Sequence, residues 1–404
     1  MRNKRLDVLR FVAVALVISA HSGFPSITHN IGWVGVDLFF VLSGFLISGL
    51  LYSEYKATES IDFKRFFVRR GLKIYPAFYV LIAVTGIASA VGWTGIPTGT
   101  GNYFREVVFL QNYGPGLWDH TWSLAVEEHF YIGLALLLMV MVRLSPGDAN
   151  PFRKVPVICA SLGGGCLVLR GVTLWLYPNA HWRIPHPVYS MTHTRMDSLF
   201  FGVFLGYLYH FQPKIIGDFF RSRGIRVTVG VLSVALLLIC ANLKSRFYEL
   251  SFGFTGLYLG FGGLLMLSLE SRNVLRGGAA RCVEWLGNGC AYVGRRSYSI
   301  YLWHLPFLAF VPYVLTRLHV KLPELARGPV YFVGCCALGI VFARLVEFPV
   351  LELRDRFFPG QKAPLPAVSV LVEESSLVPA TAGLVGQSEV WTEESVPKKR
   401  AASA

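Results

Sequence analysis

The sequence predicts an all-α protein: a polytopic transmembrane helical bundle of about ten spans, with both termini in the cytoplasm. Three observations support this class. The composition is too apolar for a water-facing surface, apolar runs recur near the length of a membrane span, and Lys and Arg favour alternate loops. Of the 404 residues, 53% are hydrophobic and only 15% are charged, well below the charged fraction of a typical soluble domain.

Ten apolar runs account for the predicted spans. A bilayer core of roughly 30 Å requires about 20 helical residues, and most of the runs approach that length. They are continuously apolar and do not alternate, which argues against strands of a lipid-facing barrel. The runs cover residues 6–24, 32–52, 74–91, 124–142, 155–177, 198–211, 227–241, 252–269, 297–315 and 328–348.

The distribution of Lys and Arg predicts the orientation. The segments that we place in the cytoplasm, with the start of the C-terminal segment, carry 24 Lys and Arg, whereas the five opposite loops carry 8. Such an excess is typical of cytoplasmic loops. The net charge of +14 follows from this bias and does not indicate nucleic-acid binding, because the basic residues form no single patch. The cytoplasmic segments are 1–5, 53–73, 143–154, 211–226 and 270–297.

Two parts of the chain differ in composition. Residues 1–355 form the predicted transmembrane domain, whose first apolar stretch we expect to be retained as a span, because Asp7 and Arg10 interrupt the pattern of a signal peptide. Residues 356–404 are rich in Pro, Val, Ser, Ala and Glu without an apolar period, which predicts a disordered cytoplasmic tail. The seven cysteines show no CxxC pair and no metal-ligand spacing, so we expect no metal site.

The first span carries the clearest functional signal, since ionisable side chains inside a membrane are costly and by default mark a site. Arg10 and His21 are eleven residues apart, close to three helical turns, so both fall on one face roughly 16 Å apart along the axis. Asp7 lies one turn before Arg10 and is placed to pair with it. A single histidine near a helix end is usually structural, but three polar groups on one stripe favour a site.

Polar groups continue in the second span and in the basic segment after it. Asp37 lies near the outer end of that span, where it is placed to orient an imidazole, and Ser43 lies farther along. Arginine clusters suit phosphate groups, although cytoplasmic topology also favours clusters of this kind. The cations of the basic segment are Arg65, Arg69, Arg70 and Lys73.

Three later segments combine polar and aromatic residues. The fourth span opens with adjacent carboxylates, Glu127 and Glu128, which are unusual at a span entrance, although a solvated helix N-terminus accounts for them about equally well. Together with Ser43, the further pocket candidates of these segments are Trp122, Ser123, Glu128, Tyr131, Arg195, Asp197, Tyr298, Tyr301 and His304.

In their order and spacing, these segments resemble the acyltransferase 3 family of bacterial integral membrane O-acyltransferases, which includes O-antigen, exopolysaccharide and nodulation-factor acetylases. The resemblance covers residues 5–349. It rests on Arg10-x10-His21, Phe-Phe-Val-Leu-Ser-Gly-Phe at 39–45, Trp-Ser-Leu-x-x-Glu-Glu-x-Phe-Tyr at 122–131 and Ser-Tyr-x-x-Tyr-Leu-x-His at 297–304. One departure is Lys73, where the family usually has Arg; Lys keeps the charge but lacks the planar fork.

The resemblance implies an enzyme of the bacterial inner membrane that uses cytoplasmic acyl-CoA, usually acetyl-CoA, to acylate a hydroxyl of a carbohydrate or glycoside. No permanently bound cofactor is expected. His21 is the candidate general base or acyl relay, with Asp37 or Glu127 to orient it. Arg10 and the four cations of the basic segment are the candidate donor-binding residues, and His304 is expected to line the same cavity. A proton-coupled exporter of a lipid or glycan is the alternative, because intramembrane Arg, His and Glu also suit proton transport.

Overall fold

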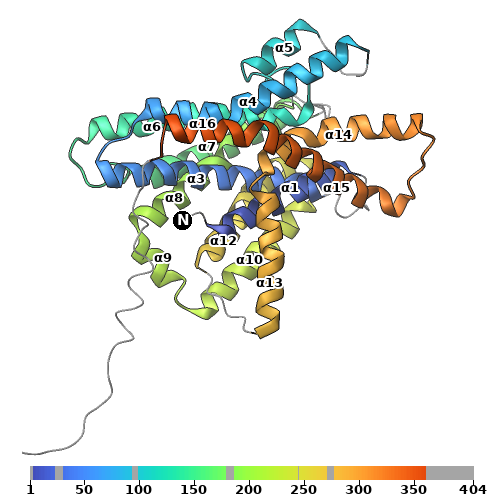
Figure 1. Cartoon of the computed structure of the whole chain (residues 1–404). Helices are drawn as coiled ribbons and strands as arrows, with labels where there is room; N and C mark the ends of the chain where they lie inside the picture. The colour runs from blue at the N-terminus through green and yellow to red at the C-terminus, as the bar shows by residue number, and fades with distance from the viewer. Residues whose placement is uncertain are drawn as a thin grey trace, which may run out of the picture. The chain divides into compact units, whose positions relative to one another are not determined.

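The computed structural model describes residues 3–22, 31–92, 99–178, 186–243, 245–270 and 277–360, and the regular elements in these ranges are all helices (Figure 1). This confirms the predicted all-α class. Of the predicted tail, 356–404, the part from residue 361 onward lies outside the described residues.

Eight helical stretches within the described ranges are long and apolar enough to cross a membrane, so the chain is a multi-pass membrane protein. Two of them begin with a 3-10 turn, η1 or η2, one begins with a π-helical turn, η3, and one contains a second π-helical turn, η4. The stretches are η1 with α3 (Gly32–Thr58), α4 (Phe63–Ala90), η2 with α6 (Asp119–Leu144), α7 (Val155–Leu176), α10 (Arg223–Ala241), η3 with α12 (Glu249–Glu270), α14 (Ser297–Arg317), and α15, η4 and α16 together (Glu324–Phe357).

The prediction of about ten spans is therefore too high by this measure. The segments predicted as the first and sixth spans do form helices, α1 (Lys4–His21) and α8 (Thr192–Phe211), but neither combines the required length, hydropathy and low charge. Helix α1 carries the predicted Asp7–Arg10 ion pair, with Arg10 Nη1 2.7 Å from Asp7 Oδ1. Helix α8 carries Arg195 and Asp197, and both side chains are buried. Their charged groups face other helices of the bundle.

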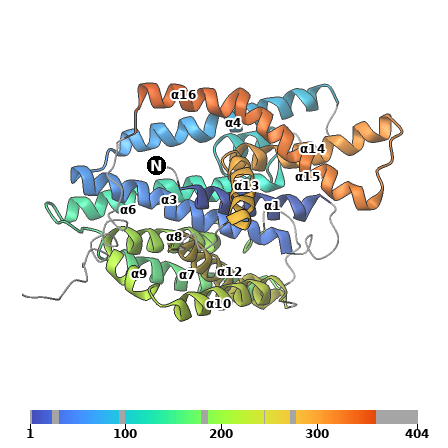
Figure 2. The same ribbon diagram turned by 60° about the horizontal axis from the view of Figure 1, so that its bottom comes forward.

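Helix α3 is the centre of the bundle. Figure 2 shows it with α6 between α4 and α16 on one side and α7, α8, α10 and α12 on the other. Its contact with α8 is close because glycines lie on both helices: a Cβ added at Gly44 would overlap the carbonyl oxygen of Leu199, and one at Gly202 would overlap that of Val41. Small residues of this kind let membrane helices approach backbone to backbone. The approach fixes the neighbouring Ser43 in the interior.

Helix α4 begins earlier than expected. The side chain of Asp62 accepts a hydrogen bond from the Arg65 backbone N–H at 2.9 Å and caps the helix at Phe63, as short acceptor side chains do at helix starts. The basic segment that was predicted as a loop before a span at 74–91 is therefore the first part of a 28-residue helix. Its cations are held on a rigid element.

The last predicted span, 328–348, is also longer than expected. Helix α15 (Glu324–Phe342) passes through the π-helical turn η4 (Ala343–Glu347) into α16 (Phe348–Phe357). A proline clashes with the carbonyl four residues before it, and a π-helical turn opens the backbone there, so Pro349 bends the chain without ending the helix. Figures 1 and 2 both show α16 lying alongside α4.

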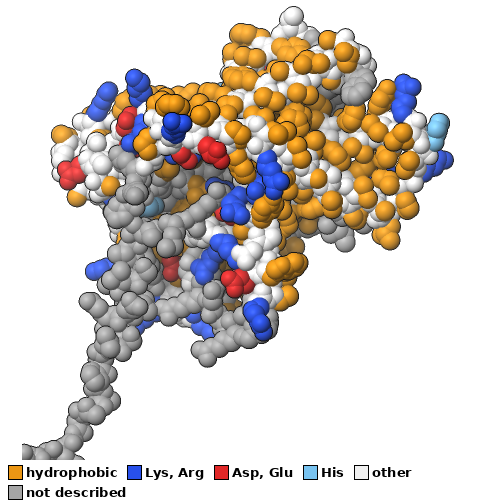
Figure 3. Space-filling view, in the orientation of Figure 1, with side chains coloured by type: hydrophobic (Ala, Val, Ile, Leu, Met, Phe, Trp, Pro, Cys, Tyr) orange, Lys and Arg blue, Asp and Glu red, His pale blue; other side chains and the backbone are white. Residues whose placement is uncertain are grey.

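The remaining helices connect the spans. The segment 270–297, predicted as a cytoplasmic loop, contains helix α13 (Gly277–Gly294), which packs on α1 with Gly294 against the Asp7 backbone. The shorter helices are α5 (Thr100–Val107), α9 (Pro213–Phe219) and α11 (Arg246–Tyr248). Figure 3 shows hydrophobic side chains over α5 and over the candidate membrane helices α14 and α15, whereas charged side chains gather near α16.

Candidate active site

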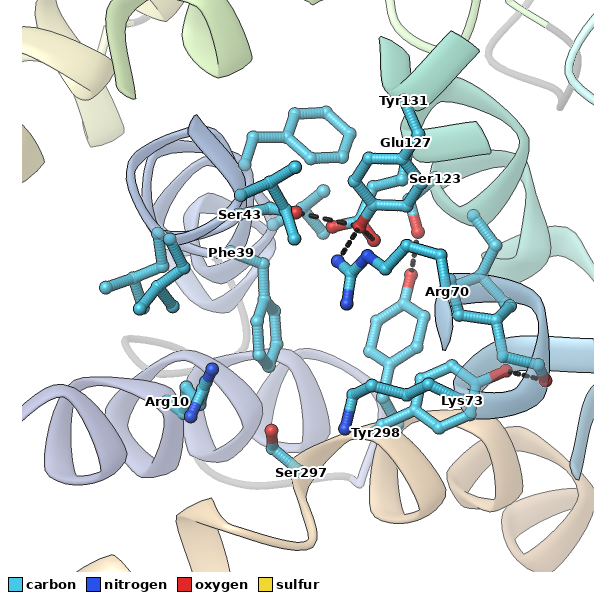
Figure 4. Close-up of a pocket in the computed structure, with 18 of the residues that line it drawn as sticks. Arg10, Phe39, Ser43, Arg70, Lys73, Ser123, Glu127, Tyr131, Ser297 and Tyr298 are labelled. Carbon is cyan, nitrogen blue, oxygen red and sulfur yellow. Dashed lines mark hydrogen bonds between the residues drawn. The ribbon is translucent and has the colours of Figure 1, made fainter. Parts of the chain in front are cut away.

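A cavity of about 140 Å³ lies between α1, α3, α4, α6 and α14. Figure 4 shows side chains from these separate helices directed toward one space. Half of the predicted site residues line it, although they come from segments far apart in the sequence. These residues are Arg10, Ser43, Arg70, Lys73, Ser123, Glu127, Tyr131, Tyr298 and Tyr301.

The hydroxyl of Tyr131 is the meeting point of three helices in this cavity. It accepts a hydrogen bond from Arg70 Nη2 at 2.7 Å and donates one to Glu127 Oε2 at 2.8 Å. The hydroxyl of Ser43 lies 2.9 Å away. Glu127 and Tyr131 are four residues apart on α6 and so share one face. This network holds Glu127 beside a cation and leaves the cavity with a defined polar wall.

Positive charge predominates around the cavity. Arg10, Arg70, Lys73 and Arg295 line it, against the single carboxylate of Glu127. Lys73 Nζ lies 3.4 Å from Glu347 Oε1, and Glu347 also accepts a hydrogen bond of 2.6 Å from Ser299. The turn η4 presents that buried carboxylate to α4. A cavity with this charge attracts anionic groups.

A second, basic cavity of about 320 Å³ adjoins the first. Its charged lining comes from Arg65, Arg69, Arg70 and Lys73 on α4, from Glu54 on α3 and from Arg354 on α16. Ile47, Arg70 and Lys73 line both cavities. All four predicted cations of the basic segment therefore meet at one place, and two of them form the common wall between the two cavities.

A group of three histidines lies next to Tyr301, one of the residues that line the first cavity. The ring of His304 is 5.3 Å from that of His21 and 4.8 Å from that of His120, measured between centroids. Tyr301, which lines the cavity, is 5.4 Å from both His304 and His120. His304 and His120 are buried, whereas His21 is exposed at the end of α1. The histidine group thus runs from the cavity wall to the surface.

Backbone carbonyls set the tautomers of these rings. Nδ1 of His21 lies 2.9 Å from the Val17 carbonyl oxygen, and Nε2 of His120 lies 3.1 Å from that of Leu302. Nδ1 of His304 donates in the same way to the Tyr301 carbonyl. A neutral imidazole that donates through one nitrogen accepts through the other, so Nε2 of His21 is the basic nitrogen. In the described ranges, no group of three or more His, Cys, Asp or Glu is placed to hold a metal ion.

A family model described as an acyltransferase domain matches residues 3–344. The chain belongs to this acyltransferase family. The match confirms the resemblance that the four sequence motifs indicated.

Curated relatives of the acyltransferase carry names that describe O-acetylation. The peptidoglycan O-acetyltransferase OatA of Listeria monocytogenes is 26% identical over 363 residues, which cover 85% of this chain and 55% of OatA. YrhL of Bacillus subtilis, provisionally named a peptidoglycan O-acetyltransferase, is 27% identical over 328 residues, 75% of this chain and 48% of YrhL. The chain thus spans about half the length of these relatives. No solved structure matches it significantly.

The acyltransferase places Asp37 away from the role expected for it. Asp37 is fully buried and accepts hydrogen bonds from Arg195 Nη2 at 2.9 Å and from Ser198 at 3.2 Å. Asp197 forms a second buried ion pair, 2.7 Å from Arg170 Nη1. Three predicted site residues therefore hold α3, α7 and α8 together by ion pairs.

Two other predicted residues and one predicted role also differ. Glu128 accepts a hydrogen bond of 2.9 Å from Tyr75, and Trp122 packs edge-on against Phe40 with centroids 5.9 Å apart. Neither is part of the cavity lining. His304, expected to line the cavity, lies behind Tyr301 in the histidine group.

Sequence reasoning missed two residues next to the histidine group. Asp119 and His120 form the turn η2 before α6, and the exposed carboxylate of Asp119 interacts electrostatically with His21. The signal was their position directly before the Trp-Ser-Leu motif. The loop leading to η2 is anchored by Glu106, whose Oε2 accepts the Leu117 backbone N–H at 3.0 Å. Burial raises the pKa of Glu106 to about 7.

Proposed function

We propose that this acyltransferase moves an acyl group, most simply acetyl, from cytoplasmic acyl-CoA to a hydroxyl of a carbohydrate or glycoside at the other face of the bacterial inner membrane, with both of its termini in the cytoplasm. The observation that supports this most is the pair of adjoining cavities that share Arg70 and Lys73. The names of the relatives, which specify peptidoglycan, support a glycan as acceptor.

The basic cavity suits the nucleotide end of the donor. Coenzyme A carries several phosphate charges, and Arg–phosphate hydrogen bonds are among the stronger polar contacts. Four arginines and Lys73 line the basic cavity. The acyl end of a donor bound there would extend past Arg70 and Lys73 through the first cavity, along Ser43, Glu127 and Tyr131, toward Tyr301 and the histidine group.

His21 is the proposed general base on the acceptor side. Its Nδ1–H is held by the Val17 carbonyl, which leaves Nε2 to accept a proton, and its side chain is exposed. The acceptor hydroxyl gives its proton to Nε2 while its oxygen bonds to the thioester carbonyl carbon. The carbon–sulfur bond then breaks, and His21 returns the proton to the leaving thiolate.

An acyl relay through His21 is the mechanistic alternative. In that sequence Nε2 itself attacks the thioester carbon and the CoA thiolate leaves. The acceptor hydroxyl then takes the acyl group from the imidazole, and its proton passes to His21 and from there to the thiolate. Mixing the purified protein with labelled acyl-CoA in the absence of acceptor separates the two. Label that stays on wild-type protein but not on His21→Gln indicates the relay, whereas an unlabelled wild type that is active with acceptor indicates direct transfer.

The proposed function is tested with purified protein in proteoliposomes that receive labelled acyl-CoA and a glycan acceptor. We expect the thioester to be consumed and the label to appear on the acceptor. His21→Gln should abolish turnover while the protein still inserts and folds, and His193→Gln, an exposed histidine on α8, is the matched control. Movement of the glycan without consumption of the thioester would instead identify the exporter.

The donor side has its own test. Arg70→Ala should raise the KM for acyl-CoA more than it lowers kcat, because the residue lies between the two cavities. Arg10→Ala should change both constants, since Arg10 lines the first cavity but not the basic cavity. Lys73→Arg should be neutral. Lys64→Ala, an exposed position on the same helix outside both linings, controls for topology. An unchanged KM for acyl-CoA in both Arg variants would refute the assignment of these residues to donor binding.

A further inference from the structure

The basic cavity is closed on one side by the last helix of the described chain. Helix α16 lies alongside α4 (Figures 1 and 2), and Arg354 and Gly360 line the cavity together with the α4 cations. Arg69 also donates to the Phe358 carbonyl at the end of α16. The cavity therefore contains a cation, Arg354, that lies outside all the sequence motifs.

One carboxylate joins the two helices. Asp355 Oδ1 lies 3.0 Å from Arg69 Nη2, 3.0 Å from Arg354 Nε and 2.8 Å from Arg354 Nη2. It thus makes contacts with both guanidinium groups of the kind that a phosphate oxygen makes. The side chain of Asp355 is 55% exposed.

This exposure distinguishes Asp355 from the other carboxylates that pair with cations of the basic cavity. Glu54, which pairs with Arg65, is 8% exposed, and Glu347, which pairs with Lys73, is 1% exposed. Buried carboxylates are costly to separate from their partners, whereas an exposed pair is worth only about 0–1 kcal/mol. Among these carboxylates, Asp355 is therefore the one that an incoming anion displaces most readily.

We propose that Arg69 and Arg354 form a phosphate-binding site for the nucleotide end of the donor, and that Asp355 occupies this site as an internal anion until the donor displaces it. The proposal rests on the proposed function, because it takes a CoA thioester as the donor. It adds α16 to the donor site. Arg354 binds a phosphate group, and Asp355 lowers the apparent affinity of the site.

Equilibrium binding of CoA to the purified full-length chain in neutral-lipid nanodiscs tests this proposal. Arg354→Gln should weaken binding about tenfold or more, as expected for a lost hydrogen bond between charged groups. Asp355→Asn should tighten binding about twofold to fivefold, because the competing charge is gone. Arg356→Gln, on the same helix but outside the cavity lining, should change nothing.

Two further arms identify the ligand group. Arg354→Gln should leave the weak binding of pantetheine, which lacks phosphate, unchanged. Anionic lipid headgroups offer the same chemistry, so phosphatidylglycerol retained by each variant is measured in parallel. Loss of this lipid in Arg354→Gln with unchanged CoA affinity would overturn the proposal and assign the site to lipid.

The outcomes separate the proposal from the function on which it rests. A wild-type chain that binds no CoA overturns both. If the wild type binds CoA and Arg354→Gln binds it equally well, the proposed phosphate site is refuted and the proposed function is not. If Asp355→Asn binds CoA no more tightly than the wild type, the proposed role of Asp355 as an internal anion is wrong. Arg354→Lys, which keeps the charge, should recover part of the affinity and excludes a folding defect as the cause.

Discussion

The buried carboxyl group of Glu106 makes the stability of the acyltransferase depend on pH, and Glu106→Gln should remove that dependence. Glu106 lies in α5, outside the membrane spans, and is completely buried. It accepts the Leu117 backbone N–H, and a Cβ added at Gly116 would lie 2.6 Å from its Oε2. The loop is closed around this carboxyl group, so water cannot solvate its charge.

The sign and size follow from the pKa of Glu106, which burial raises from 4.5 to about 7. The folded state then binds a proton more tightly than the unfolded state. Stability from this group is complete below about pH 4.5 and decreases as the pH rises to about 7, and above that it stays low. At about 1.36 kcal/mol for each pKa unit, the loss is about 3 kcal/mol.

Unfolding of wild-type and Glu106→Gln protein in detergent at pH 5 and pH 8 measures this effect. Gln keeps the acceptor oxygen for Leu117 and is neutral at both pH values. Part of the loss is already present at pH 5, so the variant should lose about 2.5 kcal/mol less than the wild type between the two pH values. The difference between the two proteins removes the pH-dependent contributions of the titratable groups that they share. Glu324→Gln, at an exposed position, is the control. Equal losses in wild type and Glu106→Gln would refute the reasoning.

Two further substitutions test the packing that holds the site. Gly44→Ala should destabilise the protein by about 1–3 kcal/mol, because the new methyl group overlaps the Leu199 carbonyl. Gly164→Ala, whose new methyl group meets nothing within 4 Å, should stabilise it by about 0.4–1 kcal/mol. Unfolding in detergent measures both, and equal free energies of unfolding for the two variants would contradict the close approach of α3 and α8. Asp37→Asn should lower the free energy of unfolding by about 3–5 kcal/mol, because it leaves Arg195 buried without its anion. The fraction of the variant that folds should keep its turnover. A well-folded but inactive Asp37→Asn would show instead that Asp37 takes part in catalysis.

The sequence was most informative where a motif is local. The spacing of Asp7 and Arg10 predicted their ion pair, which the structure contains. Glu127 and Tyr131 were both candidates from the segment at 122–131, and the structure joins them by a hydrogen bond. The order of the motifs indicated one shared site, and the cavity contains residues from each motif.

Long-range pairing was not readable in the same way. The partner of Asp37, Arg195, is 158 residues away on another helix, and each residue alone has the appearance of a functional charge in a span. The contribution of α16 was missed because the last apolar run, and with it the last predicted span, ends at residue 348. The helix continues through the π-helical turn η4, which places Arg354 in the lining of the basic cavity and Asp355 in contact with Arg69.

Because Asp37 pairs with Arg195, another group must orient the proposed base, His21. A histidine base needs one nitrogen held by an acceptor, and a carboxylate from another helix was sought for that purpose. In α1 the acceptor is the Val17 carbonyl, one turn before His21 on the same helix. A carbonyl oxygen has two lone pairs, so the Val17 carbonyl can accept from the His21 ring in addition to its helical hydrogen bond. The tautomer of His21 is therefore set within α1, and Asp37 forms its ion pair with Arg195 instead.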